Sequence, residues 1–206
     1  MPADSGALCI HPVRHGRVVP RVPSDAPHLE RAWDNFQRLL PPWLRQMAGL
    51  EPVPWSSALE VVCTRLATRS VDWWLTGSAA LAVRGVAVRP RDLDLVVAGE
   101  HARLVGDLLL DGLVEPVSPA EWFCTWWGRA VCGARVEWVG GVGPRADDPL
   151  PTDFGLAAQA RLETVHWRGH VLRVPPIGLQ REVCVRRGLS DRVKAIDSFG
   201  GARGLS

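Results

Sequence analysis

Apolar residues follow helical spacing in the first third of the chain. Between residues 29 and 40 they make one face of a helix, which Pro41 and Pro42 are expected to end or kink. Residues 43–50 are expected to form a short further turn of helix. Ser57 and Glu60 have the spacing of a capping box that opens a second helix, whose buried stripe would be Leu59, Val62, Cys63 and Leu66.

Short apolar runs then replace the helical pattern. Residues 71–75 and 92–97 read as core strands, with a helix over residues 78–83 between them and another over 101–110. Gly85 is well placed to end the first of these helices. Two further runs, 122–127 and 131–139, are rich in aromatic and β-branched residues. They predict antiparallel strands separated by residues 128–130.

The last third continues with a hairpin and two helices. Residues 164–167 and 170–174 flank Arg168-Gly169 and are expected to form a hairpin. Helices are expected over residues 177–187 and 190–199. This order of elements predicts an α/β (α+β) domain, with a small mixed β-sheet flanked by helices. Residues 1–24, rich in Pro and Arg and without steady periodicity, are expected to form a loose arm.

Composition narrows the function classes only a little. A length of 206 residues suits a single core with additions, and a net charge of +2 gives no case for non-specific nucleic-acid binding. The five cysteines are scattered without a C-x-x-C pair, which favours a reducing compartment over a disulfide framework or zinc site. Without an apolar run of membrane-spanning length or a signal peptide, we expect a soluble, cytoplasmic protein with no membrane partner.

The strand over residues 92–97 carries the candidate chemistry. Side chains alternate along a strand, so Asp92 and Asp94 share a face, about 6.6 Å apart along the chain. Leu93 and Leu95 take the other face. Two carboxylates in a largely buried strand need compensation, and Mg²⁺ carrying a phosphate is the usual cation for such a pair. The alternative is a solvated pair on an exposed strand face.

Two further features would complete such a site. Gly77-Ser78 lies where a strand turns into a helix, so that free N–H groups and the Ser78 hydroxyl could bind a phosphate. The alternative is a plain strand–helix junction with Ser78 as its cap. Glu137, in the later strand, is the candidate third carboxylate, because two Mg²⁺ ions need several bridging oxygens. Taken alone, it would more often be an edge-strand glutamate.

These motifs together resemble the nucleotidyltransferase (DNA polymerase β-like) superfamily: a Gly-Ser helix, an hDxDh strand and a later acidic strand. Residues 76–85 and 89–95 look most like its small bacterial members, among them minimal and antibiotic nucleotidyltransferases and abortive-infection toxins. The similarity is strongest over residues 57–140 and weaker through 168–176 and 187–193. It implies a nucleotidyltransferase core over 57–140. Residues 25–56 match no part of the family and are expected to form an N-terminal helical extension, and residues 141–206 are expected to form a C-terminal hairpin and closing helices of the same domain.

The resemblance implies Mg²⁺-dependent transfer of a nucleoside monophosphate from an NTP such as ATP to an acceptor hydroxyl, with loss of pyrophosphate. It makes Asp92, Asp94 and Glu137 the catalytic and metal residues, for two Mg²⁺ ions. Glu137 would also help to deprotonate the acceptor. Gly77 and Ser78 would bind phosphates. Further positive charge could come from residues that could equally be ordinary surface side chains: Arg91, Arg187, Arg192 and Lys194.

The acceptor stays open among a small molecule, a tRNA end and a protein. A second hypothesis is a weak or inactive nucleotide-binding module of a toxin–antitoxin or defence pair, with an antitoxin or a second copy as partner. The presence of all three carboxylates favours the enzyme. Most of the ten tryptophans lie in apolar stripes and are expected in the core.

Overall fold

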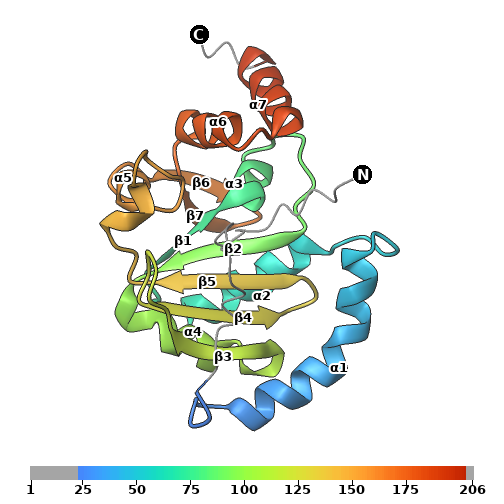
Figure 1. Ribbon diagram of the computed structural model, residues 1–206. Coiled ribbons are helices and arrows are strands. Elements are labelled where there is room, and N and C mark those ends of the chain that lie inside the picture. Colours follow the sequence, from blue (N-terminus) through green and yellow to red (C-terminus); the bar gives the residue numbers. More distant parts are fainter. Residues whose placement is uncertain (1–22, 203–206) are drawn as a thin grey trace.

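A five-stranded sheet is the centre of the computed structural model, which describes residues 23–202 (Figure 1). The predicted arm, residues 1–24, lies almost wholly outside this range. The strand order is β1-β2-β5-β4-β3, and only β2 and β5 run parallel. The sheet is therefore mixed, as the sequence predicted. Its strands are β1 (Trp73–Thr76), β2 (Asp92–Val97), β3 (Leu113–Pro119), β4 (Trp126–Val131) and β5 (Arg135–Gly140).

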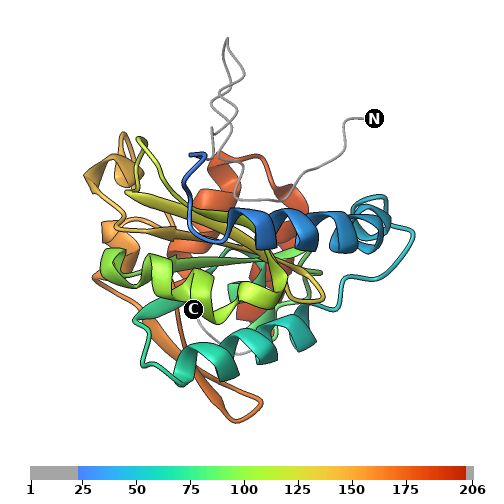
Figure 2. The ribbon, with the colours of Figure 1, turned by 90° about the horizontal axis from the view of Figure 1, so that it is seen from below.

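Helices α2 (Trp55–Ala67) and α4 (Ala102–Leu108) cover one face of this sheet (Figure 2). The predicted stripe of α2 is buried, and it forms the main core with Leu93 and Leu95 of β2. On β5, Trp138 is fully buried on this face and donates a hydrogen bond from Nε1 to the carbonyl oxygen of Ala102, at 3.1 Å. The apolar side of β2 thus faces the helices, and its acidic side faces away from them.

Helix α1 (Leu29–Met47) runs along the β3 edge as one helix, where we expected an end or kink at Pro41 and a separate turn after it. Both prolines are exposed, so the backbone carbonyls that they leave without an N–H donor can be hydrated. Asn35 anchors the helix: its Nδ2 donates to the carbonyls of Leu110 and Leu113, at 2.8 and 3.0 Å.

The predicted start of α2 is wrong. The helix begins at Trp55 with Pro54 as N-cap, and no side chain caps it. Proline suits this boundary because the first N–H groups of a helix have no intrahelical acceptor. Ser57 therefore lies inside the first turn, where it caps nothing.

The predicted break at residues 128–130 is also wrong, because these residues lie inside β4. The turn falls instead between Val131 and Arg135, with Gly133 at φ +87°. Gly128 is the register partner of Trp138, and a Cβ atom at residue 128 would stand 2.3 Å from the Trp138 ring. This glycine makes room for an indole and does not mark a turn.

The remaining elements close the domain at the β1 edge (Figure 1). The predicted hairpin is present as β6 (Glu163–Trp167) and β7 (His170–Val174), with Arg168 and Gly169 both at positive φ, as a type I′ turn requires. Helices α6 (Ile177–Arg186) and α7 (Ser190–Ala202) pack on α3 (Gly77–Val83) through an apolar cluster. The short helices are α5 (Leu156–Gln159) and three 3-10 turns, Gly99–His101, Leu110–Gly112 and Pro144–Asp147.

None of the helices between residues 23 and 202 has both the length and the apolar character that crossing a bilayer requires.

Candidate functional site

The three predicted carboxylates lie on one face of the sheet. Asp94 and Glu137 are direct register partners on the parallel strands β2 and β5. Asp92 lies two residues from Asp94 on β2 and shares its face. Neighbouring strands are about 4.8 Å apart, so β2 and β5 bring the acidic side chains together although 43 residues of sequence separate Asp94 from Glu137.

All three carboxylates are buried, at 1 to 3% exposure. Burial raises the pKa of Asp94 well above its ordinary value, and the negative charges of Asp92 and Glu137 raise it further. Burial also raises the pKa of Glu137, against the lowering effect of Arg129 and Arg135. Such a cluster is stable only if cations or protons neutralise it.

Two arginines supply part of that positive charge. Arg129 of β4 faces Glu137 and donates to it from Nε at 2.7 Å, while its Nη1 contacts Glu115 Oε1 at 2.5 Å. Arg135 of β5 pairs with Oδ2 of Asp92, and its Nε lies 3.4 Å from Glu137 Oε1. Neither arginine was predicted from the sequence to belong to the site. Alternation along β5 does put Arg135 on the face of Glu137, and this pattern could have identified it.

The cluster of three carboxylates contains hydrogen-bond acceptors that no described donor uses. Within residues 23–202, Oδ1 of Asp92 and Oδ1 of Asp94 are buried and accept no hydrogen bond. No three Asp, Glu, His or Cys groups in that range are arranged to hold a metal by themselves. Mg²⁺ commonly takes one or two carboxylates from the protein and its other ligands from phosphates and water. The two aspartates therefore fit a Mg²⁺ site of that kind.

Gly77 and Ser78 open α3 beside these aspartates. Gly77 has φ +64°, and a Cβ atom there would lie 2.5 Å from Asp94 Oδ2. The Ser78 side chain is buried, and among the described residues its hydroxyl has no hydrogen-bond partner. The predicted Gly-Ser corner and the predicted acidic strand are thus in direct contact, through Gly77 and Asp94.

A fourth carboxylate, which the sequence did not predict, lies near the site. Asp153, in the loop before α5, is buried, and burial raises its pKa. Thr76 Oγ1 donates to its backbone carbonyl at 2.6 Å, while Gln180 Nε2 of α6 donates to the carbonyl of Gly77 at 3.0 Å. Asp153 comes from a Gly-, Pro- and Asp-rich loop without periodicity, so the sequence held no signal for it.

Comparisons with known proteins identify the architecture. No family model matches the chain, and no curated protein matches it. A solved structure from Thermotoga maritima, assigned as a nucleotidyltransferase, is 17% identical over 70% of this chain and 91% of its own, with a TM-score of 0.50. The chain has the nucleotidyltransferase fold. The resemblance seen in the sequence is thereby confirmed at the level of fold.

An antibiotic-resistance factor and an antibiotic adenylyltransferase are similar at lower scores. The antibiotic-resistance factor ANT(2″)-Ia, solved with adenylyl-2″-tobramycin, is 13% identical over 71% of this chain and 90% of its own, with a TM-score of 0.48. The lincosamide adenylyltransferase LnuA, solved with lincomycin, is 12% identical over 68% of this chain and 95% of its own, with a TM-score of 0.47. With scores below 0.5, these two add nothing to the assignment of the nucleotidyltransferase fold.

The predicted basic residues are spread around this nucleotidyltransferase fold. Arg91 is exposed and directly precedes Asp92. Arg187 follows α6, and its positive charge lowers the pKa of Asp153, which links it to the neighbourhood of the site. Arg192 lies on α7, where it acts electrostatically on Cys184, and Lys194 is exposed on the same helix. Their predicted role in phosphate binding stays a prediction.

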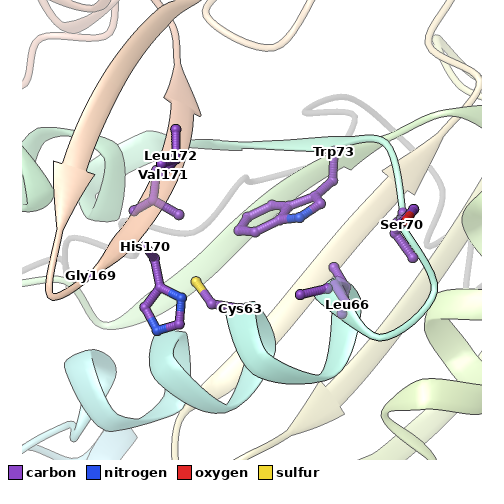
Figure 3. Close-up of a pocket in the computed structure, with 10 residues that line it drawn as sticks. Cys63, Leu66, Ser70, Trp73, Gly169, His170, Val171 and Leu172 are labelled. Carbon is purple, nitrogen blue, oxygen red and sulfur yellow. The ribbon is translucent and has the colours of Figure 1, made fainter.

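A groove of about 240 Å³ lies on the face of the sheet opposite the three carboxylates (Figure 3). Trp73 of β1 faces it, with Cys63 and Leu66 on α2 and His170 and Leu172 on β7 around the indole. Trp73 is the register partner of Val97, which points away from the carboxylate face. The sheet therefore separates this groove from the acidic cluster.

Proposed function

We propose that the protein transfers a nucleoside monophosphate from an NTP to an acceptor hydroxyl. The observation that carries the proposal is the convergence of Asp92, Asp94 and Glu137 on one face of the sheet, in contact with the Gly77-Ser78 corner. Two buried aspartate oxygens there accept no hydrogen bond from residues 23–202. The nucleotidyltransferase fold supports the same conclusion.

Asp92 and Asp94 would hold Mg²⁺, since their free oxygens suit a hard cation. Bound Mg²⁺ would neutralise negative charge on the phosphates of the NTP as the transfer proceeds. Glu137 is the less available ligand, because Arg129 and Arg135 already pair with it. The role of Glu137 as a ligand of a second Mg²⁺ ion stays a prediction.

The chain's own groups would position the reactants. Gly77 lacks a side chain that would block a phosphate beside Asp94, and the Ser78 hydroxyl is free to donate to a phosphate oxygen. Arg91 would add positive charge at the entrance to β2. Positioning and neutralisation of charge are the main requirements of phosphoryl-type transfer.

In the reaction, the acceptor oxygen forms a bond to the α-phosphorus. The bond from that phosphorus to the oxygen bridging to the β-phosphate breaks, and pyrophosphate leaves with the electron pair. The proton of the acceptor hydroxyl goes to Glu137, which burial makes more basic than a free glutamate. Arg129 and Arg135 would hold that carboxylate in place.

The acceptor classes remain a small molecule, a tRNA end or a protein. The test is incubation of the purified protein with α-labelled NTPs, Mg²⁺ and fractions of a cell extract, with label transfer and pyrophosphate release as readouts. Asp94→Asn should abolish both. The matched control is Asp34→Asn, which makes the same change at an exposed position on α1.

Label transfer by the wild type and by Asp34→Asn, but not by Asp94→Asn, would support the enzyme. NTP binding without release of pyrophosphate from any fraction would instead support the nucleotide-binding module of a defence pair. Transfer that survives Asp94→Asn would contradict the proposed site.

A further inference from the structure

Arg135 is the first residue of β5, the central strand of the sheet, which is an unusual place for an arginine. Its guanidinium lies between two of the three carboxylates, paired with Oδ2 of Asp92 and 3.4 Å from Oε1 of Glu137. The Asp92 side chain has 0% exposure, so Arg135 is its neighbour in place of solvent. A carboxylate buried this deeply would be very unfavourable as an anion without a cation beside it.

The two aspartates of β2 differ in this respect. Asp92 has a guanidinium on one oxygen, whereas neither oxygen of Asp94 pairs with a described basic side chain. Burial and the neighbouring negative charges raise the pKa of Asp94, and the positive charge of Arg135 opposes that shift. A single arginine thus carries much of the compensation for the pair that would hold a divalent cation.

We propose that Arg135 is a resident counterion of Asp92, whose guanidinium opposes a divalent cation at the aspartate pair and moves away from Asp92 when that cation binds. This inference rests on the proposed function, since it takes Asp92 and Asp94 as the ligands. Guanidinium and divalent cation repel each other and compete for one carboxylate. Binding of the metal therefore includes the free energy of breaking the Arg135–Asp92 pair.

Arg135 has a route for this displacement. Its side chain is 17% exposed at the start of β5, next to the turn after β4, so its guanidinium can move into water. Arg129 is held differently: it contacts Glu115 and lies over the rings of Trp43 and Trp127, at 5.9 and 5.4 Å. Arg129 also makes no pair with Asp92, which makes it the matched control.

The experiment measures the binding of Mn²⁺ alone, by the loss of its free electron paramagnetic resonance signal, to the full chain. Arg135→Gln should bind Mn²⁺ more tightly than the wild type, on the order of tenfold, because a competing unit charge next to the ligand is gone. The Mn²⁺ affinity of Arg135→Lys should lie between those of the wild type and Arg135→Gln, because an ammonium group cannot pair with Asp92 and Glu137 through a planar fork. Asp94→Asn should lose Mn²⁺ binding in every background.

Arg129→Gln removes the same charge from the same face of the sheet but leaves the Arg135–Asp92 pair intact. Its gain in Mn²⁺ affinity should therefore be clearly smaller than that of Arg135→Gln. An equal gain would overturn the proposal, because the effect would then be one of general field and not of displacement. Unchanged or weaker binding by Arg135→Gln would also overturn it, and would make Arg135 a structural ion pair. If Arg135→Gln does not fold, the comparison of Arg135→Lys with the wild type decides.

Failure of the two proposals can be told apart. Mn²⁺ binding that depends on Asp94 but is unaffected by Arg135 overturns the counterion role alone and leaves the proposed function standing. An absence of Mn²⁺ binding by the wild type and by both Arg135 variants, with and without an NTP, overturns both.

Discussion

Gly77 and Asp94 are in such close contact that a Cβ atom at position 77 would stand 2.5 Å from Asp94 Oδ2. The contact joins the start of α3 to the middle of β2. Thr76, the residue before Gly77, is also the register partner of Asp94 on β1. The backbone of the corner therefore fixes where this carboxylate can lie.

Gly77→Ala should damage the site more than the fold. The φ of +64° alone would destabilise an alanine by about 1–2 kcal/mol. The added methyl group must also displace the Asp94 carboxylate, and transfer activity should fall on the order of 10²-fold. Urea unfolding and label transfer measure the two effects.

Gly49→Ala is the control, because Gly49 has a similar φ of +72° with nothing within 4 Å of a Cβ atom. It should show the same loss of stability with unchanged transfer. Equal loss of activity in both variants would contradict the role given to the Gly77–Asp94 contact.

Gly128→Ala should destabilise the whole domain. The new methyl group would overlap the buried ring of Trp138, and overpacking of this kind costs about 1–3 kcal/mol. The midpoint of urea unfolding and the emission of the tryptophans both report it. In Gly178→Ala, on α6, nothing lies within 4 Å of the new Cβ atom, so stability should be unchanged or slightly higher.

Asn35→Ala should loosen α1 from the sheet edge. The buried amide donates to two carbonyls, and leaving such acceptors without a donor costs about 1–3 kcal/mol. Gln46→Ala is the comparison, because Gln46 Nε2 makes a similar 2.8 Å bond to the carbonyl of Gly133 at an exposed position. Its effect on the free energy of unfolding should stay below about 1 kcal/mol. Equal effects would show that burial of Asn35 is irrelevant.

The described cysteines should resist alkylation in the native protein. Burial raises the pKa of Cys63 to about 12, and the pKa values of Cys124 and Cys132 to about 11. Because the thiolate is the reactive form, at pH 8 only about a thousandth of a thiol with pKa 11 can react, against about a quarter of an unfolded one. Mass spectrometry after iodoacetamide treatment, with and without urea, tests this. Rapid native labelling of Cys63 would contradict its burial.

The local pattern of the chain was sufficient for much of the fold. Alternation of apolar and acidic residues placed Asp92 and Asp94 on one face of a strand, and β2 has the predicted bounds. The β6–β7 hairpin was equally plain, because two strand-like runs flank a two-residue connection that ends in glycine. The type of each of these elements depends on neighbours within a few positions, and a sequence displays those neighbours directly.

Residues whose role depends on distant partners were misread or missed. In the sequence Gly128 resembles a turn residue, but in the structure it makes room for the Trp138 ring on the neighbouring strand. Pro41 resembles the end of a helix, but it lies on the exposed side of a helix that continues past it. The same limit applies to the charges of the candidate site. Among residues 23–202, Asp92 and Glu137 have arginine partners and Asp94 has none. This follows from strand register, since pairing β2 with β5 and β5 with β4 brings residues 92, 135 and 129 onto one face. The sequence by itself determined which side chains could do the chemistry; the tertiary structure decided which charges they face, because electrostatic neighbours are set by distance in space.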